Sequence, residues 1–201
     1  MQPEHHISPS SKITRTEYKL EEARFFLKHM EQHWNHVSNV DFYLSAFVSA
    51  ARSITWIMKA EFGKNTDWSS WYESQKPTAE IDALLAKMTK VRNRSIKSTP
   101  LKTQTIANVH IPLEDLSPEG RRFLTEGALG DVRLEPFDDT NTIFTVKQGD
   151  TILGKARLKA AEHLLPEFGG QDLKNVCREY LTELEELVQK CLAKFKVQEV
   201  S

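Results

Sequence analysis

The chain is poor in cysteine, and this bounds both its chemistry and its compartment. Only Cys177 and Cys191 occur among the 201 residues, and both fall in one expected helix. At a rise of about 1.5 Å per residue, their separation along that helix places the two Cα atoms roughly 21 Å apart, too far for a disulfide. We therefore interpret both as small apolar core groups in a reducing compartment, and we expect a cytoplasmic protein.

Excess charge of one sign and long hydrophobic runs are also absent. The formal net charge is -1, so the chain as a whole does not attract nucleic acid or an anionic membrane, and any polyanion site has to be a local patch. No stretch approaches the roughly 18 apolar residues that cross a bilayer, and the start "MQPEHHISPSSK" lacks the apolar region of a signal peptide. We expect no membrane partner and a disordered N-terminal tail over residues 1–14.

Motifs that hold phosphates or metals are missing as well. The turns "GALGD" and "FGGQD" contain glycine but lack the Lys-Ser or Lys-Thr pair that a P-loop requires. His29, His33 and His36 have helical spacing, but they have no cysteine or acidic partners at matching spacing, so a surface face is favoured over a metal site. We therefore expect no metal and no cofactor.

What the chain does have is helical periodicity over its first hundred residues. Apolar residues recur three and four positions apart over residues 16–34, 41–62 and 81–98, and the aromatic segment "WSSWYES" lies between the last two. Pro100 prevents the last of these helices from continuing. Residues 15–100 are therefore expected to form an antiparallel up-and-down bundle of about four helices.

Residues 101–201 have a different pattern. The segment "TQTIANVHIP" is rich in β-branched residues and extended, and residues 142–147 and 151–158 flank a Gln-Gly-Asp turn as the two arms of a β-hairpin. The apolar face of residues 171–195 predicts a long final helix, which could dock on the bundle or mediate dimerisation. The fold class we expect is mainly α, with the bundle, a small β-hairpin and a long C-terminal helix packed on the bundle.

A cluster of cations ends the last helix of the bundle, in the segment "VRNRSIKS". Its residues Arg92, Asn93, Arg94 and Lys97 are candidates for binding an anion such as an RNA or nucleotide phosphate. The alternative is structural, because cations near a helix C-terminus interact favourably with the helix dipole, by about 0.3 to 1 kcal/mol each. The residues alone leave both interpretations open.

Arg52 is a further candidate, because it lies in the middle of a helix of otherwise apolar or small residues, "SAARSIT". Its side chain can reach the surface of the bundle and pair with a carboxylate such as Glu22. It can also point along the bundle toward Arg92, and the two would then form an anion clamp suited to phosphate.

The order of elements resembles the HEPN superfamily, whose members form up-and-down helical bundles and often carry Arg, a polar residue, a few spacers and His at the end of a late helix. Here Arg92 and Asn93 supply the Arg and the polar residue, and Lys97 stands where the family has His. The segments "YLSAFVSAARSITWIMKAEFG" and "WSSWYES" are also similar to an uncharacterised group of bacterial proteins with such a bundle and a small β-containing tail. The similarity covers most of the chain.

The resemblance implies metal-independent RNA cleavage at a site formed across a dimer cleft, with the Arg stabilising the phosphate and the His acting on the 2′-hydroxyl or the leaving oxygen. A His with a pKa of about 6.5 exchanges protons near neutrality, whereas a solvated Lys with a pKa of about 10.4 is a poor base. Lys97 therefore favours a non-catalytic homodimer that binds a phosphate-bearing ligand or an acidic protein partner. The alternatives are a toxin-type ribonuclease that uses His110 as an unconventional base, and a purely structural protein.

Overall fold

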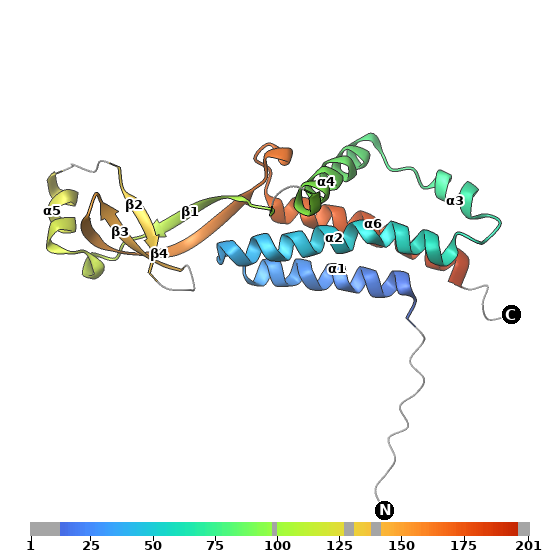
Figure 1. The fold of residues 1–201 in the computed structure, drawn as a ribbon, viewed down its shortest axis with the longest axis horizontal. Helices are drawn as coiled ribbons and strands as arrows, with labels where there is room; N and C mark the ends of the chain where they lie inside the picture. Colours follow the sequence, from blue (N-terminus) through green and yellow to red (C-terminus); the bar gives the residue numbers. More distant parts are fainter. Residues whose placement is uncertain (1–12, 98–99, 127–130, 138–141, 197–201) are drawn as a thin grey trace, which may run out of the picture. The chain divides into compact units, whose positions relative to one another are not determined.

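The computed structural model describes residues 13–97, 100–126, 131–137 and 142–196, and within these ranges the protein is mainly helical (Figure 1). Its elements follow the order α1 (Arg15–Gln32), α2 (Val37–Phe62), α3 (Trp68–Ser74), α4 (Ala79–Lys97), β1 (Gln104–His110), α5 (Pro118–Glu126), β2 (Arg133–Pro136), β3 (Ile143–Gln148), β4 (Thr151–Leu164) and α6 (Leu173–Phe195). The expectation of a mainly α chain is confirmed at this level, and a four-stranded antiparallel sheet is added to it.

The chain divides into two compact units, which are described separately. The helical unit comprises the chain up to Lys28, residues 44–101 and the chain from Asn175 onward. The sheet unit comprises residues 29–43 and 102–174. Among the helices that the structure describes, none has both the length and the apolar character needed to span a membrane.

In the helical unit, α1, α2 and α6 lie side by side and bury apolar residues, as their periodicity predicts (Figure 1). The ring of Phe47 on α2 meets that of Tyr180 on α6 edge-on, with the centroids 6.2 Å apart. The ring of Phe195 lies 5.7 Å from that of Trp68 and 5.2 Å from that of Trp71, and these contacts attach α3 to the end of α6. Full burial of such side chains contributes about 1.5 to 3 kcal/mol each, so the aromatic contacts determine where α6 packs.

The sheet has the strand order β1-β4-β3-β2. The hairpin predicted from the sequence is formed by β3 and β4, with Gln148 opposite Thr151 across the turn. The expected hairpin was incomplete, however, because β1 pairs with the second half of β4 and β2 pairs with β3. A lone hairpin is only marginally stable in water, and the two added strands supply the partners that it needs.

A helix that the sequence did not reveal, α5, packs on one face of this sheet. Phe123 of α5 contacts the buried cluster formed by Val146, Leu153 and Ala156. The helix begins after Ser117, whose Oγ accepts a hydrogen bond of 3.0 Å from the amide of Gly120, and Pro118 takes its first position. The segment "LSPEGRRFL", for which the sequence predicted no helix, thus starts one here with its proline in the first turn.

Candidate ligand site

The cation cluster singled out from the sequence lies on the last two turns of α4. Arg92, Asn93 and Arg94 are half-buried, and Nη1 of Arg92 donates a hydrogen bond of 3.3 Å to Oδ1 of Asn93. The Nε atom of Arg92 is buried and makes no hydrogen bond to any residue that the structure describes. Lys97 is the last residue of α4, and its side chain lies outside the described part of the chain.

Arg52 lies on α2 and lines a cavity of about 880 Å³, whose other walls come from α3, α4, α6 and the segment between α3 and α4. The Arg52 side chain is half-buried, and its Nη1 donates a hydrogen bond of 3.2 Å to Oγ1 of Thr55. Small-molecule sites usually measure about 300 to 1,000 Å³, so this cavity has the volume of a ligand site. Arg92 does not line this cavity, so Arg52 and Arg92 do not share it as the two halves of an anion clamp.

Other cations that line this cavity are already paired. Nζ of Lys76 lies 2.9 Å from Oε2 of Glu73, and Nζ of Lys190 lies 3.6 Å from Oε2 of Glu186. Arg52 is different, because no carboxylate of residues 13–97, 100–126, 131–137 or 142–196 lies within 4.0 Å of its guanidinium nitrogens. A guanidinium has five N–H donors, so Arg52 retains donors for an anion that enters the cavity.

Tyr180 of α6 brings a hydroxyl group to the same cavity. The residue is only 2% exposed, and burial raises its pKa to about 12, while the nearby charge of Arg52 acts in the opposite direction. The phenol is therefore neutral near neutral pH and can donate a hydrogen bond. Together, Arg52, Thr55 and Tyr180 offer one cation and two hydroxyl groups, which is a suitable set for an oxyanion.

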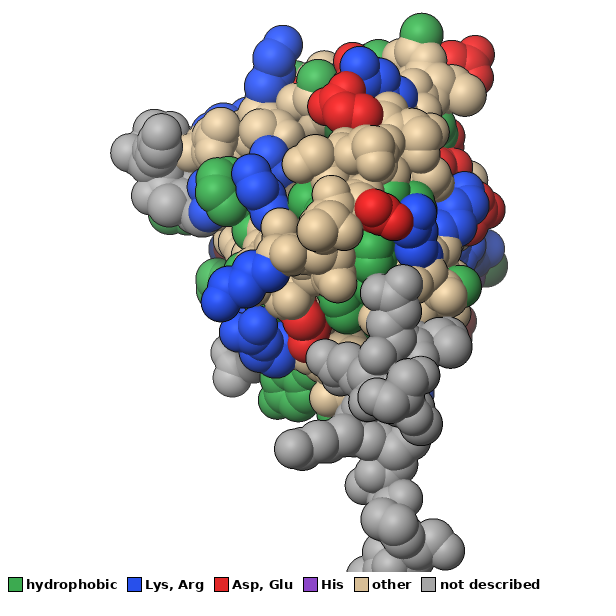
Figure 2. Space-filling view, turned by 90° about the vertical axis from the view of Figure 1, so that its right-hand side faces the viewer, with side chains coloured by type: hydrophobic (Ala, Val, Ile, Leu, Met, Phe, Trp, Pro, Cys, Tyr) green, Lys and Arg blue, Asp and Glu red, His purple; other side chains and the backbone are tan. Residues whose placement is uncertain are grey.

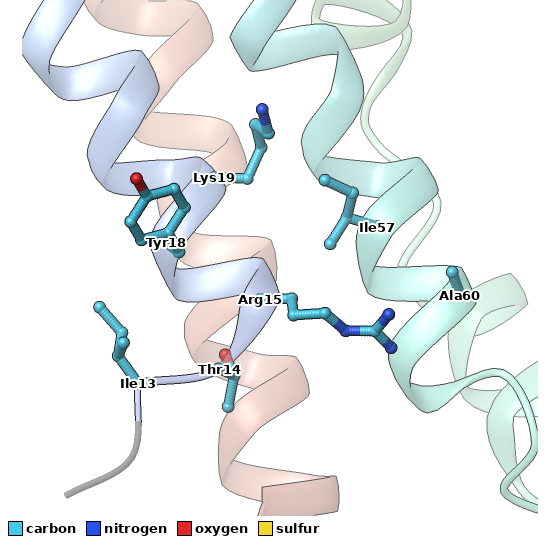
Figure 3. A pocket seen from close by; sticks show the side chains of 7 residues that line it. All are labelled: Ile13, Thr14, Arg15, Tyr18, Lys19, Ile57 and Ala60. Atoms are coloured by element: carbon cyan, nitrogen blue, oxygen red, sulfur yellow. The ribbon is translucent and has the colours of Figure 1, made fainter.

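A second hollow, smaller and more apolar, lies where α1 begins and α2 ends (Figure 3). It measures about 440 Å³ and is lined by Ile13, Thr14, Arg15, Tyr18, Lys19, Ile57 and Ala60. Its two cations have acidic neighbours: Lys19 forms an ion pair with Glu22, and Nε of Arg15 lies 3.8 Å from Oε1 of Glu61. The cavity at Arg52 is therefore the better candidate for an anionic ligand.

His29, His33 and His36 lie in a row of aromatic contacts with Tyr43. The Tyr43 ring stacks on that of His29 with the centroids 5.5 Å apart, and it meets the His33 ring at a tilt with the centroids 5.3 Å apart. The His36 ring is tilted against that of His33 with the centroids 6.0 Å apart. Within the described ranges, no group of three or more His, Cys, Asp or Glu residues could hold a metal ion. His110, the alternative base, is exposed on β1 in the sheet unit, whereas Arg92 belongs to the helical unit.

The charged side chains at the surface are mixed in sign. Over the face seen in Figure 2, Lys and Arg side chains are interspersed with Asp and Glu, which agrees with the net charge of -1. A long polyanion would meet both signs on such a face. A small ligand held by Arg52 fits this mixture of surface charges better than a long polyanion does.

The sequence singled out Arg52 but missed Thr55 and Tyr180. Thr55 follows Arg52 by three positions, so both lie on one face of α2, and this spacing was a usable signal. Tyr180 falls on the apolar face of the predicted final helix and looked like a core residue. The hydroxyl group of a buried tyrosine usually needs a hydrogen-bond partner. A tyrosine on the apolar face was therefore a signal that this part of the helix lies next to polar groups.

These features define a mainly helical protein with a four-stranded sheet and a ligand-sized cavity around a half-buried arginine. Residues 4–159 match the model of a family described as bacteriophage lambda protein ea47, and the chain belongs to this family. No curated protein and no solved structure matches the chain.

The family membership corrects the identification made from the sequence. The match is to a family of a phage protein, so the HEPN-like assignment and the resemblance to a bacterial group were wrong. The reason is that the residues at 92–96 form a short pattern, which occurs by chance at helix ends, where cations are favoured for structural reasons.

Proposed function

We propose that the protein is a non-catalytic binding module that holds a small phosphate-bearing ligand, such as a nucleotide, in the cavity at Arg52. The proposal rests on one observation: a half-buried guanidinium without a carboxylate partner in the described chain lines a cavity of about 880 Å³. Removing a cation from water without an opposite charge costs free energy. A bound oxyanion offsets that cost through short, charge-assisted hydrogen bonds.

The remaining lining suggests what the rest of the ligand is like. Apolar groups from α4 and α6 and the ring of Tyr72 line the cavity, including Ile81, Leu85, Leu184 and Leu187. They suit a flat, partly apolar body such as a nucleobase. Asp82 and Glu183 also line the cavity, and their charges oppose additional phosphates, so a monophosphate fits better than a triphosphate.

The cluster on α4 is the second candidate for an anion, whether on RNA or on an acidic protein partner. The buried Nε of Arg92, which has no hydrogen-bond partner in the described chain, supports this candidate, because such atoms in native proteins usually indicate an unseen partner. The ribonuclease alternative with His110 was motivated by the HEPN resemblance. Among the described residues, no hydrogen bond or strand pairing joins His110 to Arg92 or Asn93.

Two finer expectations about the scaffold belong to the same proposal. We infer that the helical unit is an antiparallel bundle, because α1 and α2 are joined only by residues 33–36, and short connections favour antiparallel neighbours. We also infer a cytoplasmic location. Cys177 and Cys191 are buried thiols, which suits a reducing compartment.

Calorimetric titration of the full chain with AMP, with inorganic phosphate and with a short single-stranded RNA tests the proposed ligand. We expect AMP to bind, and Arg52→Gln to weaken its binding about tenfold or more, because a hydrogen bond to a charged group contributes about 1.5 to 3 kcal/mol. The matched control is Lys59→Gln, an exposed cation on the same helix that does not line the cavity. It should bind AMP like the wild type.

Three results would reject the proposed ligand site at Arg52 or assign ligand binding to another part of the chain. If the wild type binds neither AMP nor phosphate, the proposal fails and a purely structural role remains. Equal AMP affinity of the wild type and Arg52→Gln would also reject the cavity as the site. RNA binding that survives Arg52→Gln but is lost in Arg92→Gln would assign the function to the cluster on α4 instead.

A further inference from the structure

Strand β1 forms one edge of the sheet, and its own sequence has neither the charges nor the proline that normally protect such an edge. Residues 103–111, "TQTIANVHI", contain no Lys, Arg, Asp, Glu or Pro. Five of the seven residues of β1 are exposed. Natural edge strands are kept from pairing with other chains by charges, by proline, by short length or by a covering element.

The opposite edge of the same sheet shows the contrast. Strand β2 has only four residues, and Arg133, Glu135 and Pro136 are three of them. Short length, charge and proline thus protect this edge in three ways. One edge of the sheet is therefore closed to strand addition, whereas the other is open.

Among the residues that the structure describes, the backbone of β1 pairs on its inner side alone. Every residue of β1 pairs with β4, from Gln104 opposite Leu164 to His110 opposite Arg157. No other backbone hydrogen bond joins residues 104–110 to the rest of the described chain. The outer N–H and C=O groups therefore form a template for one more strand.

We propose that the occupant of this edge is β1 of a second copy of the chain, paired antiparallel around a two-fold axis at Ala107. The two four-stranded sheets would then continue into each other across the axis. This assignment goes beyond the ligand proposed for Arg52, and it does not depend on it.

The sequence of β1 is complementary to itself in this register. Ala107 faces Ala107 of the second copy, Thr105 faces Val109, and Ile106 faces Asn108. Residues directly opposite each other in an antiparallel pair point to the same face, so each copy keeps the same face of its sheet exposed. No like charges are brought together, and a β-branched Thr and Val form two of the central pairs.

The ends of the strand limit the pairing and add opposite charges. Pro112 lacks an N–H donor and ends the ladder on one side. Lys102 comes opposite Pro112 of the second copy, next to the turn Leu113–Asp115, which carries Glu114. A cation of one copy thus lies close to a carboxylate of the other at both ends of the paired segment.

Sedimentation velocity of the full chain over a concentration series tests this interface. We expect the wild type to approach twice the mass of one chain. Ile106→Lys introduces a charge at a residue that is 50% exposed in one chain and opposite Glu162 within its own sheet. The fold should tolerate the change, whereas dimerisation should weaken roughly fivefold or more. The control Ile152→Glu, at a residue that is 53% exposed and opposite Lys147, should dimerise like the wild type.

The register is tested by Ala107→Lys and Ala107→Glu, which place like charges opposite each other in a homodimer. Each variant alone should be mainly monomeric, and a mixture of the two should recover the dimer. A wild type that remains monomeric would overturn the proposal, as would a dimer that resists Ile106→Lys. A mixture that associates no better than its components rejects the axis at Ala107. Loss of the dimer in Trp56→Ala, at an exposed ring on α2, with no effect of Ile106→Lys, would place the interface on the helices and also overturn it.

Discussion

The imidazole of His163 meets the indole of Trp34 edge-on, with the ring centroids 4.7 Å apart. Nε2 of His163 donates a hydrogen bond of 2.7 Å to the carbonyl oxygen of Trp34, and Nε1 of Trp34 donates one of 2.8 Å to the carbonyl oxygen of Ala161. These bonds attach the connection between α1 and α2 to β4. Because a carbonyl oxygen can only accept, the proton of the neutral imidazole lies on Nε2.

The other ring nitrogen of His163 faces two threonines. Oγ1 of Thr103 and Oγ1 of Thr105 each lie 3.1 Å from Nδ1. The hydroxyl of Thr103 donates to Oδ1 of Asp41 at 2.8 Å, so Thr105 is the donor to Nδ1. His163 is 1% exposed, and burial, aided by the charge of Lys174, lowers its pKa, while the bonded carbonyl and Asp41 oppose the shift. The ring is thus held neutral inside the sheet unit.

We expect the protein to lose stability as the pH falls below about 6.5, the ordinary pKa of histidine. When the pKa of a histidine is lower in the folded state, the unfolded chain binds more protons between the two pKa values. The contribution of His163 is therefore fully present above about pH 6.5 and decreases as the pH falls toward the pKa of the folded state. Urea denaturation between about pH 7.5 and pH 5 measures this dependence.

The variant His163→Gln separates this histidine from the other six in the chain. It should be less stable than the wild type at neutral pH, because the bonds to Trp34 and Thr105 are disturbed. The fall in stability from pH 7.5 to 5 should also be smaller than in the wild type. An unchanged pH dependence would show that other groups cause it.

Glu61 at the end of α2 caps the beginning of α1, and we expect its removal to destabilise the helical unit. Its carboxylate accepts hydrogen bonds from the amides of Arg15 and Thr16, at 3.0 and 2.9 Å, and from the Thr16 hydroxyl at 2.6 Å. The first amides of a helix have no partner within the helix and lie at its positive end. Glu61→Ala leaves the fully buried Thr16 without its acceptor, which should cost about 1 to 3 kcal/mol.

The free energy of unfolding in urea measures this loss, and Glu73→Ala is the matched control. Glu73 is an exposed carboxylate whose ion pair with Lys76 lies on the surface, so its removal should change stability by less than about 1 kcal/mol. Glu61→Gln keeps an acceptor oxygen and should fall between the wild type and Glu61→Ala. A loss in Glu73→Ala as large as that in Glu61→Ala would contradict a capping role.

The helices were predictable because their signal is local. Apolar residues three and four positions apart indicated α1, α2, α4 and α6, although α2 begins at Val37, four residues before its expected start at Asp41. The residues just before the expected start, "NHVSN", are mostly polar, yet Val40, which directly follows them and precedes Asp41, is fully buried. Burial by distant parts of the chain, which a local pattern does not contain, decided this boundary.

The sheet and the cavity depend on contacts between distant segments, which explains why they were only partly predicted. Gln104 pairs with Leu164, and no local pattern in either segment specifies the other. Arg52 was recognisable alone, as a cation in an apolar helix, but Tyr180 becomes part of the site only when α6 packs beside α2. Arg52 was therefore found because the pattern of its own helix was enough to single it out. Tyr180 was missed because its place at the cavity depends on the packing of two helices.

Gly120 allows α5 to lie directly against β4, and we expect Gly120→Ala to destabilise the sheet unit. A Cβ atom at this position would lie 1.9 Å from the carbonyl oxygen of Leu153 and 2.8 Å from its carbon. Because these are backbone atoms, the strain is relieved only by moving the helix off the sheet, which also disturbs the packing of Phe123. The cost should be about 1 to 3 kcal/mol.

This expectation has the opposite sign to helix propensity, which favours alanine over glycine by about 1 kcal/mol. The neighbouring variant Glu119→Ala, at an exposed position of the same helix, is the control and should leave the urea midpoint nearly unchanged. If Gly120→Ala is as stable as the wild type, α5 is not held at this distance from β4.

The two cysteines should be unreactive in the folded protein. Both are buried, and burial raises the pKa of Cys191 to about 12, with the charge of Glu61 acting in the same direction. Only the thiolate reacts with disulfide reagents, and at pH 8 a thiol with this pKa is ionised in about one molecule in ten thousand.

In an assay with dithionitrobenzoate, the native chain should therefore react slowly and the urea-unfolded chain should release two equivalents at once. The variant Cys191→Ala should release one equivalent when unfolded and remain slow when native, because Cys177 is also fully buried. Fast reaction of either thiol in the native chain would mean that α6 opens readily from the helical unit, and this would contradict the packing of Phe195 against Trp68 and Trp71.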